Sequence, residues 1–476
     1  MSSLVADAAA PIAPKAELRE RTAPASPAGP VDATTPIRVP AGPRAPMSVQ
    51  TARFVRDPMG STLSSFGQFG DVWELKLASR PEPFVVTTHP DHVKSLMTAN
   101  PADAPSLTGE SPLRPILGPN SVLTLIGERH MRQRKLLLPP FHGDAVARYV
   151  EMIERVVDQE LSTWQTGQTL RLAERMQAVT LEVIMSGVFG IEPGGAGRSS
   201  GRRLRVLVSR LMKGSSTIFW RLAELQNIRR VEPRGTMKFF LDMLDTRMYA
   251  VIAERRALGV IPGRHDVLSL LLEARDEDGR PLTDHELRDE LLTLLLAGHE
   301  TTANSLAWTF ERLLRTPATY DRLRAVVRDA DDDAGAYIEA TINEGMRVRP
   351  VIPFVVRQVK RPWRFGEYVV PADTPIAMSI IALHHRSDVY PDPHRFEPDR
   401  YMNVKPGTYT WIPFGGGIRR CLGATLAMAE QRVVVRALAE RVDLTAPSSE
   451  PERPRQRNVT MIPAKGGLVT VQRMLT

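Results

Sequence analysis

The sequence predicts a mainly helical α+β protein with small β-sheets, built around one long buried helix. Near the N-terminus, residues 72–77 alternate apolar and polar side chains, as strands do, and a second short stretch follows at 83–88 after a proline-containing turn. Later segments instead repeat apolar residues every three or four positions, as amphipathic helices do. One of these helices, over 283–315, is apolar nearly all round and should pass through the middle of the domain.

The chain has 476 residues, of which 42% are hydrophobic and 24% charged, which is ordinary for a globular protein with a sizeable core. Residues 1–45 are rich in alanine and proline and predict a disordered tail. No repeat or linker divides residues 46–476, so a single domain is expected there.

Net charge and cysteine content limit the cellular compartment and the classes of partner that are expected for this protein. One cysteine excludes an internal disulfide framework and favours a reducing compartment. No apolar run approaches the ~18 residues of a membrane span, and no signal peptide is visible. We therefore expect a cytoplasmic protein without a transmembrane anchor. The net charge is +8, but basic residues are scattered among acids, which argues against a nucleic-acid partner and leaves room for an acidic protein partner.

The elements follow in order along the chain. Strands are predicted over 72–77 and 83–88, and a helix over 146–164. The long helix starts at a capping box formed by Thr283 and Glu286.

A polar interruption, AGHETT over 297–302, breaks the apolar character of the long helix. A buried acid costs several kcal/mol unless it is paired or protonated, and a mid-helix glycine costs about 1 kcal/mol relative to alanine. Gly298 and Glu300 together therefore predict a local distortion with a function. A zinc-protease motif is excluded because Ala303 stands where a second histidine is required. Glu300 and Thr301 could deliver protons to a bound ligand, or the segment could be a partly exposed turn.

Several charged residues occur at helical spacing. Glu344 and Arg347 share one face of a helix, either as an exposed ion pair or as part of a buried network with Arg400. His130 and Arg134 also share a face, either as a basic surface or as donors to an anionic cofactor group.

The only cysteine lies in FGGGIRRCLG, residues 414–423. The loop lacks the Gly-Lys-Ser/Thr of a phosphate-binding loop, and one cysteine is too few ligands for zinc. A helix follows Gly423, a position that should lower the pKa of the Cys421 thiol. A single thiolate among N–H donors suits one axial ligand of a haem iron, and Arg419 would then meet a haem propionate.

At this point the sequence resembles the cytochrome P-450 family over about residues 46–476. Residues 414–423 satisfy the haem-binding signature, 297–301 match the oxygen-activation motif, and Glu344 with Arg347 match the E-x-x-R motif, with Arg400 as third member. His130 departs from the tryptophan that many members carry. The resemblance implies the fold of that family and haem contacts from His130, Arg134, Ala297, Gly298, Arg357, Phe414, Arg419 and Gly423.

The resemblance also implies a haem-thiolate monooxygenase. Cys421 would be the axial ligand of haem b, O2 the co-substrate, and Glu300 with Thr301 the route for protons. The substrate would be a hydrophobic molecule such as a fatty acid, terpene or steroid, bound among apolar segments at 111–118, 216–220 and 351–356. Electrons would come from a ferredoxin or flavodoxin served by an NAD(P)H-dependent reductase. Basic side chains could dock that carrier: Arg129, Arg132, Lys135 and Arg420.

Three rival functions differ in what they require. A peroxygenase or isomerase on the same fold would usually lack the acid–alcohol pair. A haem-based sensor would not need Glu300 and Thr301 in a buried helix. A helical binding protein without haem would leave Cys421 and its glycines unexplained.

Overall fold

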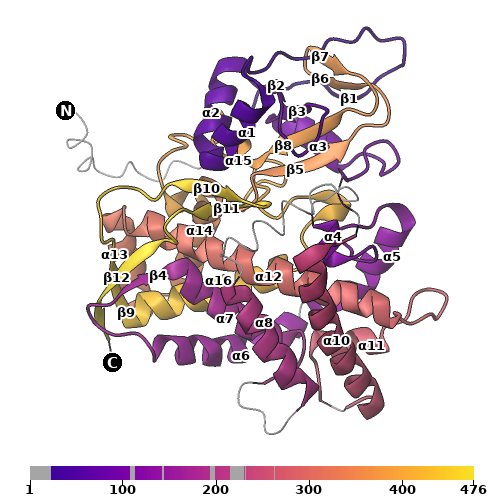
Figure 1. The fold of residues 1–476 in the computed structure, drawn as a ribbon. Helices are drawn as coiled ribbons and strands as arrows, with labels where there is room; N and C mark the ends of the chain where they lie inside the picture. The colour runs from indigo at the N-terminus through magenta and orange to yellow at the C-terminus, as the bar shows by residue number, and fades with distance from the viewer. Residues whose placement is uncertain are drawn as a thin grey trace.

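The computed structural model describes residues 23–107, 113–141, 144–192, 199–214, 230, 232–261 and 263–475. A helical body lies beside a smaller region that contains most of the strands, and helix α12 (Asp284–Leu313) runs through the middle (Figure 1). This architecture confirms the predicted mainly helical α+β fold class.

The other described helices pack around α12 and the sheets. They are α1 (Met47–Arg56), α2 (Pro58–Phe69), α3 (Pro90–Met97), α4 (Arg114–Leu117), α5 (Gly127–Leu137), α6 (Asp144–Leu161), α7 (Leu172–Gly187), α8 (Ser200–Gly214), α10 (Gly235–Leu258), α11 (Val267–Glu273), α13 (Pro317–Arg328), α14 (Ala334–Val348), α15 (Ile380–His384) and α16 (Ala424–Arg441). Among the described residues, no helix is long and apolar enough to cross a membrane.

The strands form four small sheets. The largest has the order β2-β3-β8-β5, made of β2 (Val72–Leu75), β3 (Phe84–Thr87), β8 (Pro375–Ser379) and β5 (Phe354–Gln358). The others are β1 (Ala28–Pro30) with β6 (Trp363–Phe365) and β7 (Tyr368–Val370); β4 (Thr169–Arg171) with β12 (Leu468–Met474) and β9 (Val442–Thr445); and the pair β10 (Pro454–Arg457) and β11 (Thr460–Pro463). The strands predicted at 72–77 and 83–88 are confirmed as the antiparallel pair β2 and β3.

Helix α12 connects two hydrophobic cores. Its first half contributes leucines such as Leu291 and Leu295 to a core shared with α5, α7, α8, α10 and α11. Its second half contributes Leu306 and Phe310 to a core shared with α6, α7, α13, α14 and α16. The polar interruption at 297–302 therefore lies where the helix passes from one core to the other. The predicted capping box of Thr283 and Glu286 is present at its start.

The local distortion expected at Gly298 is not found, because α12 is helical without a break from Asp284 to Leu313. A Cβ at Gly298 would lie 2.9 Å from Cδ1 of Ile184 on α7, which is too close for any other residue without a shift. Thr180 of α7 also donates a hydrogen bond to the His299 carbonyl over 2.6 Å. The glycine thus leaves room for the Ile184 side chain and does not bend α12.

Residues 23–45, expected to be disordered, instead include an ordered strand. β1 pairs with β6 in antiparallel register, Ala28 opposite Phe365. The amide of Ser26 donates to Asp91 over 2.9 Å, and its hydroxyl lies 2.9 Å from Nε2 of His92. Pairing with β6 and the Asp91 carboxylate on α3 satisfy backbone groups of this segment, which alanine and proline content alone does not reveal. Residues 1–22 lie outside the described part of the chain.

Candidate active site

The loop that carries Cys421 is a tight turn closed by its own backbone. The Cys421 amide donates to the Phe414 carbonyl over 2.9 Å. Gly417 has a φ of +60°, and a Cβ there would overlap the carbonyl oxygen of Met97 at the end of α3, so only glycine fits. Helix α16 begins at Ala424, directly after its N-cap Gly423, which confirms that Cys421 precedes a helix N-terminus.

The Cys421 side chain is exposed, yet enough protein surrounds it that burial raises the pKa of the thiol. The Gly423 N–H and the positive charges of Arg134 and Arg420 oppose this rise without cancelling it. The expected lowering of the thiol pKa is therefore wrong for the free side chain, because burial outweighs the helix N-terminus. An exposed thiol surrounded by protein faces an opening within the fold, and a metal ion bound there would deprotonate it.

Four basic side chains from three elements act on one another beside this loop. His130 and Arg134 come from α5, Arg357 from β5 and Arg419 from the cysteine loop. Burial, followed by the charges of Arg419, Arg134 and Arg357, lowers the pKa of His130 to about 3. Burial also lowers the pKa of Arg357 to about 10, and burial with the repulsion of Arg357 and Arg134 does the same to Arg419. We call these four residues the cation cluster.

Within the described ranges, no carboxylate forms an ion pair with the cation cluster. Arg419 donates instead to the carbonyls of Val122, over 3.1 Å, and Leu125, over 2.5 Å. Arg357 is only 5% exposed, and its guanidinium donates to the carbonyl of Val356 over 3.0 Å. Buried positive charge without an acid is costly, so this arrangement is typical of a binding site for an anionic group.

These residues fit a haem. A haem carries two propionate carboxylates, which the cation cluster could bind, and an iron that accepts one thiolate, which Cys421 could supply. Phe414 packs beside the loop with its ring centroid 6.0 Å from that of Trp411, which holds it at the start of the turn. Gly423 directs its N–H toward the sulfur.

On α12, Ala297 is exposed although Leu295 and His299 nearby are buried. The Thr301 hydroxyl donates to the Ala297 carbonyl over 2.8 Å. Glu300 has different partners: its Oε1 accepts from the Thr460 hydroxyl over 3.3 Å and lies 3.8 Å from Nε of Arg457. The acid and the alcohol of the predicted pair thus contact different groups in this structure.

The structure brings Glu344, Arg347 and Arg400 together in a buried network. Arg347 donates to both carboxylate oxygens of Glu344, over 2.7 and 2.8 Å, and neither side chain is exposed. Arg400 lies 3.4 Å from the same carboxylate. Arg347 also donates to the carbonyls of His384 and Pro393, so it joins α14 to the chain that leads to the cysteine loop.

The sequence reasoning missed a buried acid behind α12. Glu430 of α16 is 4% exposed, and burial raises its pKa to about 8, with only the Thr302 hydroxyl opposing the rise. Ser305 of α12 donates to Gln431 of α16 over 2.7 Å, so polar contacts also join these two helices. The signal that could have found it is the spacing of Glu430 within α16, because Glu430 lies four residues before the buried Val434 on the same helix face.

Arg132 and Lys135, which were expected to belong to a basic docking face, both form ion pairs with acidic side chains. Arg132 is only 25% exposed and forms ion pairs with Asp276 and Glu286 at 2.6 and 2.8 Å. Lys135 pairs with Glu277 at 2.6 Å, but both side chains are exposed. The charge of Arg132 is thus neutralised within the protein.

Comparisons with known proteins show the family of the chain. The chain matches the family Cytochrome P-450 over residues 40–471. It is 35% identical over 447 residues to cytochrome P-450 135B1 of Mycobacterium tuberculosis, which covers 92% of both chains. It is 39% identical over 358 residues to cytochrome P-450 137 of the same organism, which covers 75% of this chain and 74% of that one.

Two solved structures share the fold at 22% identity. One is a cyanobacterial cytochrome P-450 with bound retinoic acid, with a TM-score of 0.74 over 92% of this chain and 100% of that one. The other is the haem domain of cytochrome P-450DA, with a TM-score of 0.75 over 92% of this chain and 98% of that one. The chain therefore belongs to the cytochrome P-450 family of haem-thiolate monooxygenases, oxidoreductases that use O2, a small-molecule substrate and a redox partner.

Proposed function

We propose that this chain hydroxylates a hydrophobic small molecule such as a fatty acid, terpene or steroid, with Cys421 as axial ligand of the haem iron. The observation that carries the proposal is the exposed Cys421 thiol beside the cation cluster, of which His130 and Arg357 are buried and which has no acid partner in the described part of the chain. A basic surface helix does not account for this combination, because His130 and Arg357 are buried. A helical binding protein without haem leaves the thiol unexplained.

The cation cluster would hold the two carboxylates of the haem. A hydrogen bond to a charged group contributes about 1.5–3 kcal/mol, so a few such bonds outweigh the cost of the unpaired arginines. Arg134 would have a second role besides binding a carboxylate, because its positive charge favours the thiolate form of Cys421. When bound, the haem supplies the binding and activation of O2 for insertion into a C–H bond.

Glu300 and Thr301 would supply the protons. Arg457, which is 28% exposed, lies next to Glu300, so the acid connects the outer surface with the buried helix. The Thr301 hydroxyl occupies the adjacent position on α12, where it donates to the Ala297 carbonyl over 2.8 Å. A positioned acid–base group of this kind contributes about 10²–10⁴-fold in rate.

Half-buried apolar residues near the site support a hydrophobic substrate. Leu113 and Ile116 beside α4, and Leu294 and Leu296 on α12, pack only partly against the core. Val355 on β5 is also half-buried and is the nearest side chain to Gly415. The stretch 216–220, expected to line the pocket, lies outside the described residues.

For the electron carrier, we propose an acidic ferredoxin or flavodoxin with an NAD(P)H-dependent reductase. Arg129, Lys135 and Arg420 are exposed and remain candidates for its docking face, whereas Arg132 does not. The cytoplasmic location and the single domain over 46–476 stay predictions.

The first experiment is the absorption spectrum of the reduced, haem-loaded protein with carbon monoxide, recorded beside Cys421→Ser. A strongly red-shifted Soret band that the substitution abolishes is expected for thiolate ligation. A band at the position of histidine-ligated haem, unchanged in the variant, would rule out Cys421 as ligand.

A second experiment tests the proton route with Thr301→Ala and Glu300→Gln. We expect product formed per electron consumed to fall by about 10-fold or more in each, since proton delivery limits productive use of O2. Full retention of coupled activity would remove both residues from the route. Efficient turnover with hydrogen peroxide and no carrier would instead favour a peroxygenase.

A further inference from the structure

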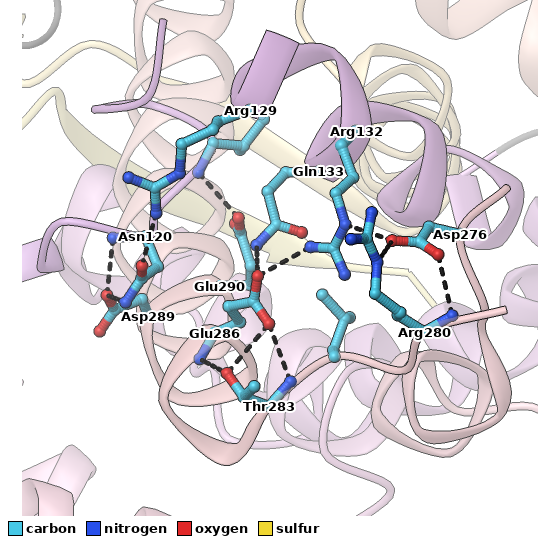
Figure 2. A network of polar contacts seen from close by, with 12 residues as sticks. Asn120, Arg129, Arg132, Gln133, Asp276, Arg280, Thr283, Glu286, Asp289 and Glu290 are labelled. Carbon is cyan, nitrogen blue, oxygen red and sulfur yellow. Dashed lines mark hydrogen bonds and ion pairs between the residues drawn. The ribbon is translucent and has the colours of Figure 1, made fainter. Parts of the chain in front are cut away.

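Four polar residues follow one face of the first half of α12 and all bond to the chain between residues 118 and 133. They are spaced i, i+3, i+4 and i+7, which places them on one side of the helix: Glu286, Asp289, Glu290 and Thr293. We call this set the anchor face. Its bonding partners are the segment before α5 and α5 itself, most of which Figure 2 shows.

The two carboxylate oxygens of Glu286 accept hydrogen bonds from different parts of the chain. Oε2 caps α12 by accepting from the Thr283 amide over 2.8 Å and its hydroxyl over 2.9 Å. Oε1 accepts from Arg132 over 2.8 Å and from Gln133 over 3.3 Å, both on α5 (Figure 2). Arg132 also donates to Asp276 over 2.6 Å, and this bond lowers the pKa of Asp276.

The rest of the anchor face holds residues 120–122. Asp289 accepts from the Asn120 amide over 2.9 Å, and Thr293 donates to the Ser121 hydroxyl over 2.6 Å. Glu290, which is fully buried, accepts from the Val122 amide over 2.8 Å. The carbonyl of the same Val122 receives a hydrogen bond from Arg419. One residue therefore links the anchor face to the cation cluster.

The geometry of α5 explains what the Arg132 contacts achieve. Residues two apart on a helix are rotated by about 200°, so Arg132 lies nearly opposite both His130 and Arg134. Its guanidinium bridges two acids that are 7% and 17% exposed, so these ion pairs are shielded from water more than ordinary surface pairs. Fixing one side of α5 thus fixes the direction of the two donors on the other side.

We propose that the anchor face positions the site that binds the haem carboxylates. Through Arg132 it sets the orientation of α5 with His130 and Arg134, and through Val122 it sets the position of Arg419. Arg132 and Glu286 are positioning residues that act through the cation cluster. This inference rests on the proposed function, in which the cation cluster faces the haem.

The test is the rate at which the loaded protein loses haem to an excess of a haem-scavenging protein. Glu286→Gln keeps the cap, because glutamine also completes a capping box, but removes the charge that Arg132 contacts. We expect haem loss to be about 5–20-fold faster in Glu286→Gln and in Arg132→Gln, the effect of weakening one or two charged hydrogen bonds. Lys135→Gln is the matched control, since it removes one positive charge from the same helix at an exposed pair, and should stay within about two-fold.

A second comparison separates positioning from simple stabilisation. If Arg132 acts through His130 and Arg134, then Arg132→Gln should change haem loss by less than about two-fold in a background that already carries both His130→Gln and Arg134→Gln. Independent, multiplying effects would overturn the proposal. If Arg132→Gln does not fold, Arg132→Lys, which keeps the charge and one bond, should show an intermediate rate.

The spectrum with carbon monoxide distinguishes a failure of the proposed function from a failure of the positioning role. Absence of the red-shifted band in the unsubstituted protein would contradict the proposed function itself. A normal band with haem loss unchanged in Arg132→Gln and Glu286→Gln would contradict only the positioning role.

Discussion

Two groups of buried arginines in this protein have opposite electrostatic surroundings. Arg347 is fully buried, and the Glu344 carboxylate outweighs the effect of burial, so the pKa of its guanidinium is raised. Arg357 is almost as buried, but burial acts alone and lowers its pKa to about 10. The first arginine has its counter-charge inside the protein, and the second does not.

The difference separates a structural network from a binding site. A buried charge that is already paired gains nothing from a ligand, whereas an unpaired one gains a partner when an anion binds. Burial alone is not enough, because burial also lowers the pKa of Arg349, to about 9, and that guanidinium lies over the Trp308 ring at 5.6 Å. What distinguishes the cation cluster is that several such groups converge beside an exposed thiol.

The largest effect is expected from breaking the paired network. Arg347→Met leaves the Glu344 carboxylate buried without its partner, and the free energy of unfolding should fall by about 3–5 kcal/mol. Urea unfolding of the haem-free protein measures this directly. Arg347→Lys keeps the charge but loses the carbonyl contacts. Its free energy of unfolding should lie between those of the unsubstituted protein and Arg347→Met. A loss below about 1 kcal/mol would show that the network is not structural.

The same substitution in the cation cluster should behave differently. Arg357→Met removes an unpaired buried charge, so the stability of the haem-free protein should stay constant or rise by about 1 kcal/mol, while haem loss becomes about 10-fold faster. Lys360→Met, at an exposed pair with Asp373 just beyond the same strand, should change neither quantity appreciably. Parallel losses of stability in Arg357→Met and Arg347→Met would erase the distinction between the two groups.

A smaller effect should appear in the pH dependence of stability. The pKa of His130 is about 3 in the folded protein against 6.5 ordinarily, so between these values the unfolded chain binds a proton that the folded chain does not. The contribution of His130 to stability is therefore complete above pH 6.5 and is lost as the pH falls toward 3. In urea unfolding of the haem-free proteins, the unsubstituted chain should lose stability relative to His130→Gln across this window.

The control for that experiment is the haem-loaded protein. Anionic carboxylates beside His130 would raise its pKa and flatten the difference between the two proteins. Other buried histidines with lowered pKa values, such as His92 and His384, are present in both chains and cancel. A difference that persists unchanged after haem binding would place the carboxylates elsewhere.

The sequence predicts the structure correctly where residue type and local spacing determine it. The capping box of Thr283, the strands at 72–77 and 83–88 and the position of Cys421 before α16 all follow from local patterns. Long-range contacts set the rest. The side chain packed next to Gly298 is Ile184 on another helix, and the partners of Arg132 lie more than 140 residues away in the chain. The thiol pKa also depends on total burial, which no local motif encodes.

The central claim is that the cation cluster binds the carboxylates of the haem. It is tested most directly by comparing the affinity of the haem-free protein for haem and for haem dimethyl ester, in which both carboxylates are neutral. Haem should bind about 100-fold more tightly than the ester, and Arg357→Met should narrow this ratio to about 10-fold. Equal affinity for the two compounds would contradict the claim.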